Sequence, residues 1–231
     1  MKYFLLALAI IILICIIDYF RYANQRKKVE GAFLIMPTQY GDVEYIDLGP
    51  KDAPVILFVT GGGAGIDSVY ALDWLLETGY RVLSINRPGY YNLPLEAIDD
   101  IREQADIFHA VIEKLGIASV HVFGISMGGV SALYYAQKYP TESLVLWSAV
   151  TGTYHPNPES MDSPLGKLFL SPSGKKIVSW MTGRSIRLAF KETVMTFLQV
   201  EADLPKADLK KIADQMAADP EVREQTIRFV E

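Results

Sequence analysis

The sequence predicts an α/β fold with a mainly parallel sheet, preceded by a transmembrane helix. Strand-like and helix-like segments alternate between residues 43 and 148, as they do in βαβ units. Residues 54–60 form a continuously apolar strand, which is typical of a parallel sheet buried on both faces. The first apolar run of the chain, at residues 3–17, is long enough to enter a bilayer.

Length and charge exclude several classes of protein. A chain of 231 residues can build one sizeable domain with a real core, or two small ones. A net charge of −5 argues against a nucleic-acid partner, for which a basic patch is expected. Cys15 is the only cysteine, so no intrachain disulfide can form and the fold does not depend on an oxidising compartment.

The first apolar run reads as a single-pass membrane anchor. Residues 3–17 are uninterrupted apolar sequence, and Asp18, Tyr19 and Phe20 extend the run toward the interface. A full span takes about 20 residues. No small-x-small cleavage site follows, which favours an uncleaved anchor over a signal peptide.

Basic residues flank this run unequally. Only Lys2 precedes it, whereas four basic side chains follow it: Arg21, Arg26, Lys27 and Lys28. Because positive charge stays on the cytoplasmic side, the bulk of the protein is predicted at the cytoplasmic face. We therefore divide the chain into an anchor with its basic flank at residues 1–28, an α/β core at 29–151 and a helical lid at 152–231.

The core elements follow from hydrophobic periodicity and turn signals. The predicted strands are residues 32–37, 43–48, 54–60, 81–86, 119–123 and 143–148, and the predicted helices are residues 69–78, 95–115 and 127–138. A turn at Gly41-Asp42 makes the first two strands a hairpin, which gives the sheet an antiparallel edge. Gly79, Gly116 and Pro140 end the three helices.

The alternation stops at Gly152. Residues 153–163 read as a loop. Helical patterns then occupy residues 165–200, with a turn at Pro172-Ser173-Gly174, and residues 207–218 and 221–230. These helices are expected to form a lid over the sheet edge where active sites lie; the alternative is a separate helical domain.

The sequence Gly-Ile-Ser-Met-Gly-Gly, residues 124–129, lies between a predicted strand and a predicted helix. Gly-x-Ser-x-Gly in this context predicts a nucleophile elbow, a turn so sharp that Ser126 takes a strained backbone conformation. A side chain at Gly124 or Gly128 would collide with the neighbouring backbone. The following helix points its N-terminus at the site, so the N–H of Met127 is one expected oxyanion donor.

A glycine-rich loop, Thr60-Gly-Gly-Gly-Ala-Gly65, directly follows the apolar strand. A phosphate-binding loop would end in Gly-Lys-Ser/Thr, which is missing here. A dinucleotide fingerprint would need glycine at position 66, where this chain has isoleucine. The loop better suits the second half of an oxyanion hole, with Gly62 donating its N–H.

At these residues the chain resembles the α/β-hydrolase family. The resemblance rests on residues 60–65, 87–90 (Arg-Pro-Gly-Tyr) and 124–129, in the family's order and spacing. It implies Ser126 as the nucleophile, with Gly62 and Met127 as oxyanion donors, and a loop at residues 87–90 beside the active site, to which we assign a packing role. The family usually has His-Gly where this chain has Thr60-Gly61.

A serine nucleophile needs a base, and the family places an acid and then a histidine downstream of it. His109 lies on helix 95–115, opposite its apolar stripe, and is predicted to be exposed to solvent. His121 lies within the strand leading to the elbow, more than about 10 Å from Ser126 at ~3.3 Å per residue, and is predicted to be a core residue.

The third histidine is the one remaining candidate for the base. His155 follows a strand on the correct edge of the sheet. The only carboxylate between Ser126 and His155 is Glu142, at the opposite end of that strand; Glu159 or Asp162 could serve in an unusual order. The strands whose loops would present acid and base are not found either, so the sequence predicts a hydrolase truncated at its C-terminus.

The functional expectation is a membrane-anchored serine hydrolase that acts on an ester-like or other acyl bond, with a small-molecule acyl substrate. No metal or other cofactor is implied. Two alternatives remain: a non-catalytic binding protein that keeps the fold without the triad, and a membrane-attached interaction module that uses its helical lid.

Overall fold

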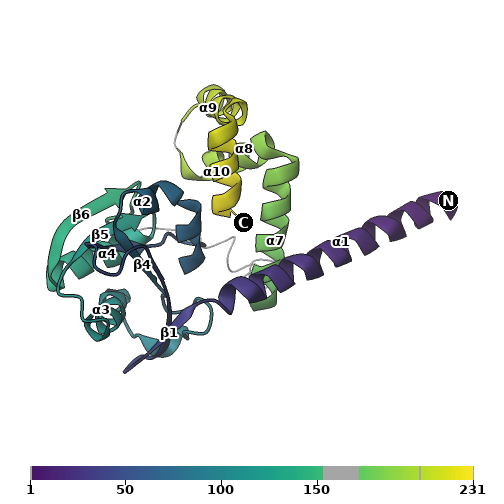
Figure 1. The fold of residues 1–231 in the computed structure, drawn as a ribbon. Coiled ribbons are helices and arrows are strands. Elements are labelled where there is room, and N and C mark those ends of the chain that lie inside the picture. The colour runs from purple at the N-terminus through teal and green to yellow at the C-terminus, as the bar shows by residue number, and fades with distance from the viewer. Residues whose placement is uncertain (1, 153–171, 203, 231) are drawn as a thin grey trace. The chain divides into compact units, whose positions relative to one another are not determined.

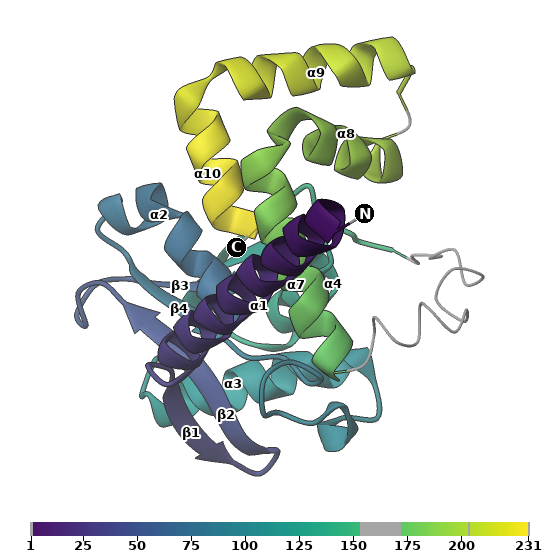
Figure 2. The ribbon, with the colours of Figure 1, turned by 90° about the vertical axis from the view of Figure 1, so that its right-hand side faces the viewer.

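The structure, a computed structural model, describes residues 2–152, 172–202 and 204–230. The chain divides into two compact units. One comprises Gly31–His155, and the other combines Met1–Glu30 with Pro156–Glu231. Figures 1 and 2 show the elements of both units.

A six-stranded sheet forms the first unit. Its strands are β1 (Leu34–Thr38), β2 (Gly41–Leu48), β3 (Val55–Val59), β4 (Arg81–Ile85), β5 (Val120–Ile125) and β6 (Thr141–Trp147). The spatial order is β1-β2-β4-β3-β5-β6. Strands β4, β3, β5 and β6 run parallel, whereas β1 and β2 form an antiparallel hairpin at one edge. The predicted α/β class with a mainly parallel sheet is confirmed.

Helices cover both faces of the centre of this sheet. All five residues of β3 are buried, as predicted for a strand covered on both sides. Leu57 and Val122 contribute to the core beneath α3 (Gln104–Lys114) and α4 (Gly128–Lys138). On the opposite face α2 (Asp73–Glu77) places Trp74 against Phe123.

Two predicted helices of this unit are interrupted. The segment predicted as one helix from 95 to 115 forms two 3₁₀ turns, η2 (Leu95–Ala97) and η3 (Ile101–Glu103), before α3 begins. The Asp100 side chain accepts a hydrogen bond of 2.8 Å from the backbone N–H of Arg102 and so caps the N-terminus of η3. Short polar side chains compete with helical hydrogen bonding in this way. The segment at 69–78 likewise begins as a 3₁₀ helix, η1 (Ile66–Ala71).

The described residues of the second unit form helices. They are α1 (Lys2–Glu30), α7 (Pro172–Leu188), α8 (Phe190–Glu201), α9 (Lys206–Ala218) and α10 (Pro220–Val230). Ile186, Phe190, Val194, Ala213 and Ile227 form the shared core of α7–α10. The turn predicted at residues 172–174 is wrong: these residues begin α7, where proline is well tolerated. The loop predicted at 153–163 lies outside the described residues.

Helix α1 has the length and composition of a membrane span. It contains 29 residues, its most apolar stretch has a mean hydropathy of 2.7, and none of that stretch is buried within the structure. A signal sequence at the same position would meet the same criteria.

Candidate active site

The turn between β5 and α4 holds Ser126 in a strained conformation. Its φ angle is +50°, in the left-handed region that non-glycine residues rarely occupy. The Ser126 carbonyl accepts hydrogen bonds from the N–H groups of Gly129 and Val150, at 3.0 and 2.8 Å. These two bonds hold the turn in place against its conformational cost.

The two flanking glycines are each required by a close approach. A Cβ atom on Gly128 would lie 2.4 Å from the Val59 carbonyl oxygen and 2.5 Å from that of Thr60, both at the end of β3. A Cβ atom on Gly124 would lie 2.6 Å from the Cβ of Ala132, so here the obstruction is a side chain on α4 and not the backbone. The strand–turn–helix geometry therefore accounts for glycine at both positions.

The glycine-rich loop after β3 lies directly beside the turn. A Cβ atom on Gly61 would lie 3.5 Å from the Ser126 hydroxyl oxygen, and one on Gly62 would lie 2.9 Å from Cγ of Met127. The structure thus brings the two predicted donor residues, Gly62 and Met127, together beside the predicted nucleophile. Within the described part of the chain, neither of their N–H groups donates a backbone hydrogen bond.

Arg87 and Tyr90 hold this loop from its outer side. The Arg87 guanidinium donates a 2.5 Å hydrogen bond to the carbonyl oxygen of Gly61. The Tyr90 hydroxyl accepts a 3.0 Å hydrogen bond from the N–H of Gly63, and the guanidinium lies 4.7 Å from the centre of the Tyr90 ring. Burial lowers the pKa of Arg87, while Tyr90 opposes that shift. Hydrogen bonds on both sides of Gly62 therefore fix the orientation of its peptide group.

A buried carboxylate orders the loop that contains Arg87 and Tyr90. Glu44, on β2, is 4% exposed, and its oxygens accept hydrogen bonds from Asn86 Nδ2 at 2.8 Å and Asn92 Nδ2 at 2.7 Å. Asn86 in turn accepts from the N–H of Arg87 at 2.8 Å and donates to the Tyr90 carbonyl at 2.9 Å. Residues 87–90 were predicted to have a packing role, whereas no role was predicted for Glu44, Asn86 or Asn92. The only sequence signal was polar residues directly after an apolar strand.

Both described histidines are engaged away from the turn. His121 Nδ1 lies 2.9 Å from the hydroxyl of Ser143, on β6, and the ring contacts Tyr80 edge-on. His121 is half-buried and so not the fully buried core residue that was expected. His109 stacks on Tyr139 at 3.8 Å between ring centres, and the expectation that it is exposed is wrong. Tyr139, just after α4, covers it.

His155, the remaining candidate for the base, and the carboxylates Glu159 and Asp162 lie outside the described residues. In the part of the chain that the structure describes, no histidine is hydrogen-bonded to Ser126.

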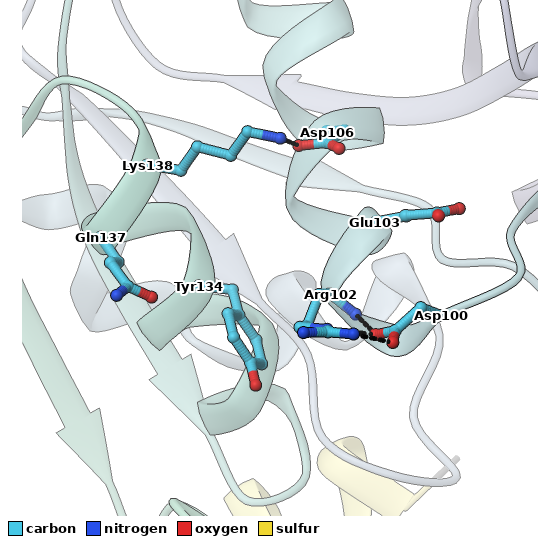
Figure 3. Close-up of a pocket in the computed structure, with 7 residues that line it drawn as sticks. All are labelled: Asp100, Arg102, Glu103, Asp106, Tyr134, Gln137 and Lys138. Carbon is cyan, nitrogen blue, oxygen red and sulfur yellow. Dashed lines mark hydrogen bonds and ion pairs between the residues drawn. The ribbon is translucent and has the colours of Figure 1, made fainter.

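A surface hollow of the first unit lies elsewhere. Its volume is about 490 Å³, and it opens between η3, the start of α3 and the far end of α4 (Figure 3). Ion pairs between Lys138 and Asp106 (2.7 Å) and between Arg102 and Asp100 (2.5 Å) line it. Lys138 is ten residues along α4 from Gly128, or about 15 Å at 1.5 Å per residue. Neither Ser126 nor the glycine-rich loop contributes to this hollow.

Comparison with known families identifies the class. A sequence model described as "alpha/beta hydrolase fold" matches residues 54–183, which include β3, the glycine-rich loop and the Ser126 turn. The chain belongs to the α/β-hydrolase fold family.

Individual proteins that resemble this chain are named as hydrolases or as members of the same fold family. The chain is 29% identical over 178 residues to a protein of Bacillus subtilis (strain 168) named "Uncharacterized hydrolase YcgS", covering 76% of this chain and 61% of that protein. It is 39% identical over 116 residues to the "Bifunctional esterase/perhydrolase DCH" of Acinetobacter calcoaceticus, covering 47% and 41%. An α/β-hydrolase fold protein from Nakamurella multipartita superposes with a TM-score of 0.70 at 25% identity, covering 86% and 67%. The chain thus spans about three-fifths or less of these two curated relatives.

Proposed function

We propose that this protein is a membrane-anchored serine hydrolase that cleaves an ester-like or other acyl bond through an acyl-enzyme. The observation that supports this most is the strained Ser126 turn, with the glycine-rich loop packed against Ser126 at Gly61 and against Met127 at Gly62. The relatives named hydrolase and esterase/perhydrolase support the same class of reaction.

In this mechanism the Ser126 hydroxyl attacks the acyl carbonyl. The oxyanion that forms accepts hydrogen bonds from the N–H groups of Gly62 and Met127, and the N-terminus of α4 adds a favourable dipole. Donors of this kind contribute about 10²–10³ in rate each, because they are already oriented when charge develops. The base that takes the serine proton is expected downstream of Ser126, in the order that the family uses.

A second candidate function is binding without catalysis. One observation favours it: the two described histidines, His109 and His121, contact side chains other than that of Ser126. A fluorophosphonate probe distinguishes the two functions, since it reacts only with an activated serine. Labelling of the folded protein supports the hydrolase, and the absence of labelling in a folded sample favours the binding protein.

Membrane anchoring gives a separate prediction. If α1 spans a bilayer with residues 21–28 on its cytoplasmic side, the intact protein should remain with membranes after carbonate washing. Deletion of residues 1–28 should release the rest of the chain into the soluble fraction. Sedimentation followed by immunoblotting measures both, and recovery of the intact chain in the supernatant would contradict the anchor.

Arg87 is predicted to act as a positioning residue for the glycine-rich loop. Replacing Arg87 with methionine removes the hydrogen bond to the Gly61 carbonyl, so the Gly62 N–H loses its fixed orientation. Misplacement of about 1 Å can cost 10²-fold in rate, and we expect fluorophosphonate labelling of Ser126 to slow by up to about that factor.

The matched control for this variant is Arg102→Met, which removes an exposed arginine that is paired with Asp100. This change should leave the labelling rate unaltered. A smaller loss is expected for Tyr90→Phe, which removes only the acceptor for the Gly63 N–H. An Arg87→Met protein that folds normally and is labelled at the unchanged rate would refute the positioning role.

A further inference from the structure

A polar junction joins the apolar helix α1 to α7. The Asp18 carboxylate accepts hydrogen bonds from Arg184 Nε at 2.6 Å, Arg184 Nη2 at 3.2 Å and Trp180 Nε1 at 2.8 Å. The Trp180 ring also meets Tyr19 edge-on, with 5.7 Å between ring centres. These contacts attach α7 at one defined level along α1.

That level coincides with the end of the apolar run. Asp18 directly follows residues 3–17, so α7 contacts α1 within one helical turn, about 5.4 Å, of the point where the apolar sequence ends. Tryptophan and tyrosine are the residues enriched at the boundary between the acyl chains and water. If α1 spans a bilayer, Trp180 and Tyr19 therefore lie at the depth of the lipid headgroups.

Helix α7 crosses α1 instead of running along it, as Figures 1 and 2 show. In Figure 1 the N-terminal half of α1 projects from one side of α7, and α8, α9 and α10 lie on the other side. A helix that crosses a membrane span near its end lies roughly in the plane of the interface. Its side away from α8–α10 then faces the acyl chains.

The side chains on that side of α7 are apolar and exposed. Ile177, Met181 and Leu188 recur at helical spacing and are 41%, 52% and 87% exposed, and Val178 beside them is 36% exposed. Ile186 points the other way and is fully buried in the core shared with α8–α10. The exposed side chains of residues 177, 178, 181 and 188 are called the α7 stripe below.

We propose that α7 is an interfacial helix, with the α7 stripe inserted into the leaflet from which α1 emerges. This inference rests on the proposed membrane anchoring by α1. We infer that lipid covers the α7 stripe, because the stripe adjoins the Asp18 junction and that junction lies at the end of the apolar run of α1. Basic side chains near this level would attract anionic lipid headgroups. They are Lys176 on α7 and, just beyond the apolar run, Arg21, Arg26, Lys27 and Lys28.

The arrangement has a consequence for the helical unit. A second apolar contact with the leaflet prevents α7–α10 from rotating freely about α1, so the unit keeps one face toward the lipid. An α1 anchor alone would leave that orientation undefined.

Site-specific fluorescence tests the proposal on the full-length protein in vesicles of phosphatidylcholine and phosphatidylglycerol. Cys15 is the only cysteine and lies exposed on α1, so an environment-sensitive probe on it reports the anchor itself. Met181→Cys and Leu188→Cys, each in a Cys15→Ser background, report the α7 stripe. Lys210→Cys, exposed on α9, is the control within the same unit.

Quenching by lipid with a spin label near the headgroup and by aqueous iodide gives the readout. We expect the lipid quencher to reduce emission at positions 15, 181 and 188, and iodide alone to reduce it at position 210. Lipid quenching at 15 with only iodide quenching at 181 and 188 would overturn the inference and leave the anchor standing. Protection of 181 and 188 from both quenchers would also overturn it, because protein would then cover the stripe. No lipid quenching at 15 would refute the anchor and the inference together.

Discussion

Alanine at position 126 is expected to abolish fluorophosphonate labelling and any acyl-enzyme turnover. The proposed reaction passes through a covalent bond to the Ser126 oxygen, and Ser126 combines a left-handed backbone with the close approach of the glycine-rich loop at Gly61. Where a serine nucleophile has its full set of partners, its loss costs about 10⁶-fold in rate. Intact-mass spectrometry after probe treatment measures the effect directly.

Ser143→Ala is the matched control for this change. Ser143 is an exposed serine whose hydroxyl lies 2.9 Å from the Nδ1 of His121, so it resembles an activated serine by its partner alone. Its position on β6 gives it no part in the Ser126 turn or the glycine-rich loop. Labelling should persist in Ser143→Ala. Persistent labelling of a folded Ser126→Ala protein would show that Ser126 is not the reactive serine. Loss of labelling from Ser143→Ala would point to Ser143 instead.

The largest effect on stability is expected from Gly128→Ala. The added Cβ would lie 2.4 and 2.5 Å from two backbone carbonyl oxygens at the end of β3, and neither can rotate away as a side chain would. Overpacking typically costs 1–3 kcal/mol, and we expect about 3 kcal/mol or more because the obstruction is backbone in the centre of the sheet. Gly128→Val, with a larger side chain, should prevent folding of the Gly31–His155 unit altogether.

Urea unfolding followed by circular dichroism measures this loss. Gly152→Ala is the control, since a Cβ atom there meets no heavy atom of the described residues within 4 Å and its φ lies outside the left-handed region. It should change the free energy of unfolding little. A Gly128→Ala protein as stable as the unsubstituted one would mean that α4 does not approach the end of β3 as closely as the structure has it.

Much of the sheet could be predicted because hydrophobic periodicity is a local property of the sequence. The continuous apolar run at 54–60 correctly indicated a strand buried on both faces, observed as β3. The prediction of one helix at 95–115 was wrong at Asp100, whose side chain accepts a hydrogen bond from the backbone N–H of Arg102. His109 was misjudged for a different reason. Its burial depends on Tyr139, which lies thirty residues away and belongs to another element.

What the sequence by itself determined is the Ser126 turn. A strand, a glycine, a serine and a second glycine specify a sharp strand-to-helix turn, because the steric demands of such a turn fall on residues within a few positions of each other. The apolar run that forms most of α1 was determined in the same way, by composition over one continuous stretch.

Only the tertiary structure decided which residues support these features. Arg87 and Tyr90 reach Gly61 and Gly63 across 26 and 27 residues, Glu44 reaches Asn92 across 48, and Asp18 reaches Arg184 across 166. A hydrogen bond between distant residues leaves no periodic pattern in either partner's neighbourhood, since its geometry exists only after the strands and helices have packed. The positions of the polar partners around Ser126 and along α1 are therefore properties of the fold, whereas the features that they support could be predicted from the sequence.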